Sequence, residues 1–208
     1  MLENPAQSLV KHETRDHIAI ISVDNPPMNV LDFPTKLALL DVFRDLEERE
    51  YDIEVVILTS SGNRSFMIGE DHRSLLVFQP EMVTQRLRAS HALFAAIAKC
   101  TWPVIAAIHG YCLGEGLELA ISCDVRYASE TAVIGFSGVN LSTPCVNNKT
   151  IHAQNCINAG HPNKILDSGI IISTGEALLC GLIDRAVPDG QVLQAALELA
   201  RTIVKHAA

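Results

Sequence analysis

The sequence predicts an α/β layer fold, because segments typical of strands alternate with segments typical of helices along most of the chain. The length of 208 residues fits one domain, since domains usually contain roughly 100–200 residues. Hydrophobic residues make up 48% and charged residues 19%, which are ordinary values for a globular protein. We therefore expect residues 1–208 to form a single domain with a buried core.

The charge and the apolar runs argue against several other classes of protein. The net charge of −8 disfavours a nucleic-acid-binding protein, which needs a basic surface. No apolar run reaches the ~18 residues that cross a bilayer, and residues 1–20 lack the pattern of a secretory signal. The six cysteines contain no CxxC pair and mostly lie in apolar segments, which predicts reduced thiols in a cytoplasmic protein.

The first third of the chain predicts a strand, a helix and a second strand. Residues 17–23 (HIAIISV) form a strand that ends at the turn DNPP, because no helix continues through two prolines. Residues 35–50 have apolar side chains on one helical face and charged ones, including Lys36, on the other. Residues 55–59 (VVILT) are typical of a strand in the middle of a covered sheet, and residues 60–71 are predicted as a loop.

The remaining elements follow from the same periodicities. Residues 81–100 show helical spacing that stops before a Trp-Pro pair. The other expected strands are residues 104–108, 124–128 and 132–135, and the other expected helices are residues 117–123, 176–180 and 191–205.

Residues 110–124 give the clearest indication of a functional site. A strand there leads into a turn with Gly114 and Gly116, and a helix begins. Glycines let backbone N–H groups approach a ligand, and a helix N-terminus favours an oxygen that gains negative charge. Glu118 stands among apolar residues, where a raised pKa would suit proton transfer. Alternatively, its side chain lies in water and complements the helix terminus. Residues 66–71 (FMIGED) can supply a second backbone donor.

These stretches together resemble the crotonase (enoyl-CoA hydratase/isomerase) superfamily. The matching motifs keep the family's order: NPPMNVL, VVILT, FMIGED, PVIAAIHGYCLGEGLELAISCDVRYA and GIIISTGEALLCGLIDR. They span residues 17–190, nearly the whole chain. The resemblance implies a crotonase-like (ClpP/crotonase) spiral of repeated ββα units and substrates that are coenzyme A thioesters.

The resemblance also implies catalytic roles for particular positions. The backbone N–H groups of Glu70 and Glu115 correspond to the two donors that polarise the thioester carbonyl, where family members usually have a small residue and a glycine. Glu118 corresponds to the first of two glutamates in hydratases, and Gly138 stands where the second is expected. A site with one carboxylate suits moving a proton between carbons, as in double-bond isomerisation, better than adding water.

For substrate binding, the resemblance places Arg73 on the 3′-phosphate of coenzyme A, although a solvated surface arginine is the simpler alternative. The other substrate-binding positions that it implies are Asn29, Leu31, Gly69, Asp71 and Gly114. Coenzyme A would enter as part of the substrate, so no separate cofactor is expected. We expect no metal, because the histidines and cysteines match no zinc-binding spacing.

The resulting hypothesis is an enzyme that stabilises a thioester enolate, either an enoyl-CoA hydratase or an enoyl-CoA isomerase. Two alternatives stay open. One is a degenerate member that binds acyl-CoA with little hydratase activity because of Gly138, and the other is a scaffold whose assembly matters more than chemistry.

The expected assembly is a homotrimer or a hexamer, with no nucleic-acid or membrane partner. Leu193, Leu197 and Ile203 lie on the last predicted helix with no later element to cover them, and an exposed apolar stripe usually marks an interface. Family members typically continue with further C-terminal helices, so this chain is expected to lack most of that extension.

Overall fold

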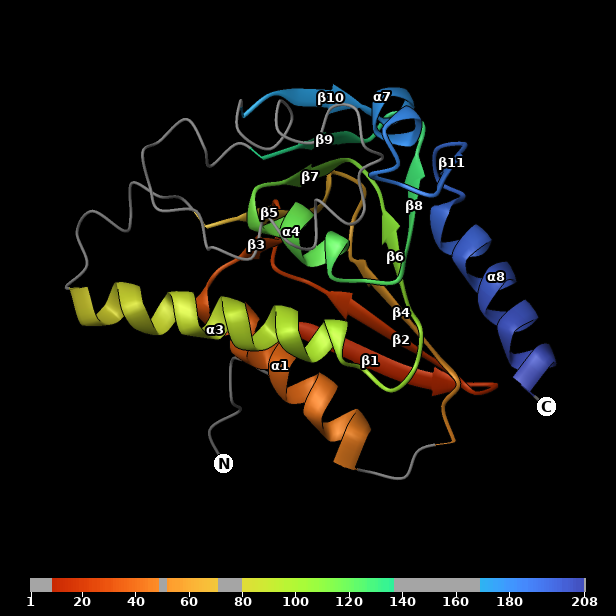
Figure 1. Ribbon diagram of the computed structural model, residues 1–208, viewed down its shortest axis with the longest axis horizontal. Coiled ribbons are helices and arrows are strands. Elements are labelled where there is room, and N and C mark those ends of the chain that lie inside the picture. The colour runs from red at the N-terminus through yellow and green to blue at the C-terminus, as the bar shows by residue number, and fades with distance from the viewer. Residues whose placement is uncertain (1–8, 49–51, 71–79, 137–168, 208) are drawn as a thin grey trace.

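The computed structural model describes residues 9–48, 52–70, 80–136 and 169–207, and within these ranges the strands form two sheets (Figure 1). The six-stranded sheet contains, in spatial order, β1 (Val10–Arg15), β2 (Ile18–Val23), β4 (Val55–Ser60), β6 (Val104–Ile108), β8 (Val125–Ser129) and β11 (Arg185–Val187). The five-stranded sheet contains β10 (Ile171–Ser173), β9 (Val133–Gly135), β7 (Tyr111–Leu113), β5 (Ser65–Gly69) and β3 (Val30–Leu31). The helices are α1 (Phe33–Glu48), α3 (Pro80–Ala98), α4 (Glu115–Ile121), α7 (Thr174–Leu179) and α8 (Val192–Ala207).

The chain repeats one unit: a strand of the large sheet, a short strand of the small sheet, and a helix. The units are β2-β3-α1, β4-β5-α3 and β6-β7-α4, and β8-β9 begins a fourth. From β2 to β11 the large sheet is parallel, as crossover connections require, and antiparallel pairs join β1 to β2 and β9 to β10. The α/β class and the spiral of ββα units are confirmed.

Strand β4 lies at the centre of the large sheet, and all six of its residues are buried. Its side chains alternate between two apolar clusters, because successive residues of a strand point to opposite faces. Val56 and Leu58 pack in the cluster that includes α1, α3 and α4, whereas Val55 and Ile57 pack against α8. Helices therefore cover both faces of the sheet, with α8 on the side opposite α1 and α3 (Figure 1).

Helix α1 begins after Asp32, whose carboxylate accepts a hydrogen bond from the Thr35 N–H at 3.0 Å and so caps the helix. The predicted apolar face is buried, but the prediction that Lys36 lies on the exposed face is wrong. Lys36 lies inside the protein with 2% of its surface exposed. It can be buried there because its ammonium group is ion-paired, as described below.

Several strands of the structure were not predicted by the periodicity. Residues 60–71 were expected to be a loop, but residues 65–69 form β5, which pairs with β3 and β7. The polar strand β1 and the short strands β3, β7, β10 and β11 were also missed. The short strands pair with strands from distant parts of the chain, which a local pattern does not reveal. Strand β1 instead forms a hairpin with the next strand, β2, and five of its six residues are exposed, so it lacks the apolar alternation that identifies a strand.

Helix α8 was predicted correctly, but the stripe expected to be uncovered on it is mostly packed. Leu197 and Ile203 are partly buried against the cluster formed by β4 and β6, and only Leu193, at 37% exposure, matches the expectation. This reduces the apolar surface that was the basis for predicting an oligomer.

Two other expectations concern the membrane and the thiols. None of the helices in the described ranges is long and apolar enough to cross a membrane. The cysteines in those ranges, at positions 100, 112, 123 and 180, carry free thiols.

Helix α4 lies directly on β5, and this contact positions the site described below. A Cβ added at Gly116 would lie 2.2 Å from the carbonyl oxygen of Met67, a distance that no side chain tolerates. The helix can approach the strand this closely only with glycine at position 116.

We predict that Gly116→Ala lowers the free energy of unfolding by about 1–3 kcal/mol, because the added methyl group overpacks the helix against backbone. Gly175→Ala in α7 is the matched control, since a Cβ there meets nothing within 4 Å. It should be neutral or stabilise the protein by up to about 1 kcal/mol. Urea denaturation measures both changes, and equal effects of the two substitutions would contradict the close packing.

Candidate active site

The structure brings the two predicted donor loops together. Strands β5 and β7 are parallel neighbours, with Ile68 opposite Leu113, so their carboxyl ends lie at the same edge of the small sheet. Glu70 follows the first strand, and Glu115 begins α4 after the second. A Cβ on Gly69 would lie 2.9 Å from the Glu115 nitrogen, which shows how closely the two loops approach.

The first turn of α4 directs backbone donors out of the helix. Gly114 precedes the helix at φ 57°, a left-handed conformation that favours glycine. The helical hydrogen bonds start with the N–H groups of Leu117 and Glu118, which donate to the Gly114 oxygen at 3.0 and 3.1 Å. The N–H group of Glu115 therefore has no acceptor within α4 itself and can serve a ligand oxygen.

Glu118 lies in the same first turn, three residues after Glu115, so both residues belong to one side of the helix. Its side chain is buried, with 6% exposure, between the fully buried Leu117 and Leu119. The alternative in which this side chain lies in water is wrong. A buried carboxylate one helical turn from a backbone donor can exchange a proton with a ligand bound to that donor.

The carboxylates of Glu70 and Glu115 are held by cations from α1 and α3. Lys36 Nζ lies 2.8 Å from Glu115 Oε2 and 3.9 Å from Glu70 Oε2. Arg86 forms an ion pair with Glu70, and Ser90 Oγ donates to Glu115 Oε1 at 2.8 Å. We call Lys36, Glu70, Arg86 and Glu115 the charge cluster. The family resemblance gave no role to Lys36 or Arg86. The signal that could have found them is that two nearly buried glutamates need cationic partners.

Two of the predicted substrate-binding residues have structural contacts. The Asn29 amide, 3% exposed, donates to the carbonyl oxygens of Ser61 and Ser65 at 3.0 and 2.7 Å. These bonds fix the chain just before β5, and Leu31 is fully buried in the core. Substrate contacts for both residues remain predictions.

Three predicted site residues, Asp71, Arg73 and Gly138, lie outside the described residues. The contact between Arg73 and coenzyme A and the role of Gly138 are predictions from the family resemblance.

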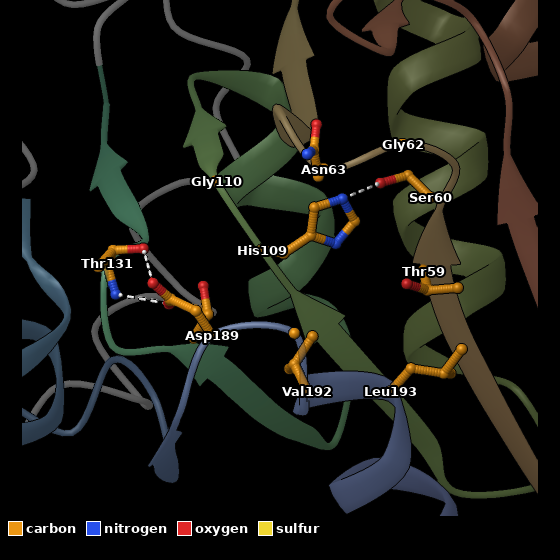
Figure 2. A pocket seen from close by; sticks show the side chains of 12 residues that line it. Thr59, Ser60, Gly62, Asn63, His109, Gly110, Thr131, Asp189, Val192 and Leu193 are labelled. Atoms are coloured by element: carbon orange, nitrogen blue, oxygen red, sulfur yellow. Dashed lines mark hydrogen bonds between the residues drawn. The ribbon is translucent and has the colours of Figure 1, made fainter.

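A separate cavity of about 570 Å³ lies at the carboxyl ends of β4, β6 and β8 (Figure 2). Thr131 donates to the carboxylate of Asp189 through its backbone N–H and its hydroxyl group, at 3.2 and 2.8 Å. His109 Nε2 lies 3.5 Å from Ser60 Oγ on the other wall. Glu118 is not among the residues that line this cavity, so it is not the predicted site.

The fold is a spiral of ββα units in which the first turn of α4, with the buried Glu118, lies beside the end of β5, and comparison with known proteins names the family. Residues 13–208 match the enoyl-CoA hydratase/isomerase family. The chain belongs to this family, which confirms the predicted crotonase superfamily and the predicted class of enzyme.

The most similar proteins include two hydratases. The chain is 31% identical over 196 residues to (E)-benzylidenesuccinyl-CoA hydratase from Thauera aromatica, covering 94% of this chain and 76% of that protein. It is 29% identical to short-chain-enoyl-CoA hydratase from Clostridium acetobutylicum, covering 94% and 75%. The crystal structure of an enoyl-CoA hydratase from Bacillus anthracis is 27% identical, with a TM-score of 0.87, covering 94% of this chain and 76% of that one.

Burial lowers the pKa of His109 below its ordinary value of 6.5, because the charged imidazolium loses solvation. The unfolded chain then binds more protons than the folded protein at mildly acidic pH. Stability is therefore lost as the pH falls from about 6.5 through the lowered pKa.

We predict that His109→Asn flattens the decline in unfolding free energy between about pH 7.5 and pH 5.5. Asparagine keeps a polar group beside Ser60 and removes the titration. Urea denaturation of both proteins at several pH values measures the difference, in which the contributions of the other titrating groups cancel. Parallel pH profiles would show that His109 does not contribute.

Proposed function

We propose that the protein acts on enoyl-CoA thioesters through an enolate, as a hydratase or an isomerase, and that Glu118 carries the proton. The observation that supports this best is the buried carboxylate of Glu118 one helical turn from the Glu115 N–H group. The carboxylates of Glu70 and Glu115 are ion-paired with Lys36 and Arg86.

In this proposal the thioester carbonyl oxygen accepts hydrogen bonds from the N–H groups of Glu70 and Glu115. Removal of a proton from the carbon next to the carbonyl shifts an electron pair onto that oxygen. Preorganised donors stabilise the developing charge more than the neutral carbonyl, and this difference lowers the barrier.

Isomerisation is the reaction that one carboxylate can complete alone. Glu118 takes a proton from carbon 2 of a 3-enoyl thioester and returns it to carbon 4, while the double bond moves between carbons 2 and 3. Atoms and electrons balance without another reactant. The presence of Gly138 at the expected second glutamate favours this reaction.

Hydration is supported instead by the relatives, which are named as hydratases. A water oxygen would bond to carbon 3 of a 2-enoyl thioester, and carbon 2 would receive a proton. Glu118 would then deprotonate the water and protonate the carbon in turn, or a neutral group would hold the water.

Separate assays with crotonyl-CoA and with a 3-enoyl-CoA, each followed by absorbance, distinguish these reactions. Loss of the crotonyl-CoA absorbance indicates hydration, and a gain from the 3-enoyl-CoA indicates isomerisation. Binding of both thioesters without turnover would favour the degenerate alternative.

The proposal includes a cytoplasmic location and assembly as a homotrimer or hexamer. These features come from the family resemblance and from the composition, and the packing of Leu197 and Ile203 weakens one argument for the assembly.

We predict that Glu118→Gln lowers kcat at least 10²-fold, because the amide cannot exchange a proton, and leaves substrate binding nearly unchanged. Glu198→Gln on the exposed face of α8 is the control and should keep full turnover. Steady-state kinetics on the substrate found above give both values. Full activity of the Glu118 variant would place the chemistry elsewhere.

We also predict that Arg73→Ala weakens coenzyme A binding by about 1–3 kcal/mol, through loss of a charge-assisted hydrogen bond to the 3′-phosphate. Calorimetry with coenzyme A and with its 3′-dephospho form gives the test. The variant should lose affinity for the first ligand only, and equal losses for both ligands would remove the arginine from the phosphate contact.

A further inference from the structure

We propose that Lys36 and Arg86 are positioning residues for the oxyanion donors. In this proposal they draw away and neutralise the carboxylates of Glu70 and Glu115, so that an enolate can form beside two acidic residues. The inference rests on the proposed function, because it assigns no substrate or reaction of its own.

The inner half of the charge cluster is Lys36 with Glu115. Lys36 is 2% exposed, and its ammonium group lies 2.8 Å from Glu115 Oε2. Ser90 donates to the other carboxylate oxygen at 2.8 Å, so both oxygens of Glu115 are turned toward α1 and α3. A charge buried this deeply requires a partner, and each residue supplies one for the other.

The outer half is Arg86 with Glu70. The guanidinium group pairs with Glu70 Oε1 and lies 5.5 Å from the centre of the Phe33 ring, a distance at which a cation and an aromatic face attract each other. Lys36 also reaches Glu70 Oε2 at 3.9 Å and links the two halves. The four side chains of the cluster sum to no net charge.

The reaction depends on this balance because the carboxylates belong to the donor residues themselves. Enolate formation places negative charge on an oxygen bound to the N–H groups of Glu70 and Glu115. An uncompensated carboxylate on either residue would repel that charge across a site with a low effective dielectric. The charge develops only after binding, so loss of a cation should reduce kcat far more than it raises KM.

The simpler alternative is that the cluster only stabilises the fold. Removal of one partner would then lower the free energy of unfolding and leave the kcat of the folded enzyme unchanged. Kinetics and denaturation measured on the same variants separate the two roles.

The test compares Lys36→Met, the double variant Lys36→Met with Glu115→Gln, and the control Lys11→Met. Lys36→Met should lower kcat by about 10- to 100-fold with little change in KM. The double variant, which also lacks the stranded carboxylate, should regain most of that loss. Lys11 is exposed on the edge strand β1 and pairs with Asp24, so its replacement should leave kcat unchanged.

If Lys36→Met does not fold, the outer half of the cluster provides the test. The test then compares Arg86→Gln with the double variant Arg86→Gln and Glu70→Gln. These two side chains are 12–16% exposed, so their replacement should destabilise the fold less than replacement of the more deeply buried Lys36. The same pattern of loss and recovery in kcat is expected. Unchanged kcat in the single variant, or a double variant no better than the single, overturns the inference.

Wild-type turnover on crotonyl-CoA and on the 3-enoyl-CoA is measured first. An active wild-type enzyme with normal kcat in the lysine and arginine variants overturns this inference alone. A folded wild-type protein without turnover overturns the proposed function, and the inference with it.

Discussion

The contact between the first turn of α4 and the end of β5 is the constraint on which the site depends. Gly116 lies against the Met67 carbonyl group, and Gly69 lies against the Glu115 nitrogen. A side chain at either glycine would separate the helix from the small sheet. Because both positions are glycine, two loops that are distant in sequence meet, and this contact brings together the two backbone donors that we propose for the thioester oxygen.

The charge cluster is a consequence of the residues at this contact. Both donor positions carry glutamate, and both glutamates are nearly buried, so their carboxylates need cations. A buried ion pair is seldom more stable than well-packed apolar residues, since desolvation opposes the attraction. Stability alone therefore gives no reason to keep four charges here, whereas control of the charge beside the proposed carbonyl-binding site does.

Local patterns predicted the apolar strands β4 and β6 and the amphipathic helices, and they left open whether the side chain of Glu118 is buried or lies in water. They failed where a residue's environment is set by distant parts of the chain. Strand β5 exists through pairing with β3 and β7. Helical periodicity wrongly placed Lys36 on the exposed polar face, because the partner that allows its burial, Glu115, comes from another unit of the spiral. The ion pair with Glu115 allows Lys36 to be buried, and a local sequence pattern cannot predict an ion pair between residues so far apart in the chain.

The central claim is that the backbone N–H groups of Glu70 and Glu115 polarise a thioester carbonyl. Difference infrared spectroscopy of isotope-labelled crotonyl-CoA bound to the Glu118→Gln variant measures this polarisation without turnover. Two hydrogen bonds from these donors should weaken the carbonyl bond and move its stretching band to lower frequency than in water. A bound thioester whose carbonyl band stays at its frequency in water would contradict the claim.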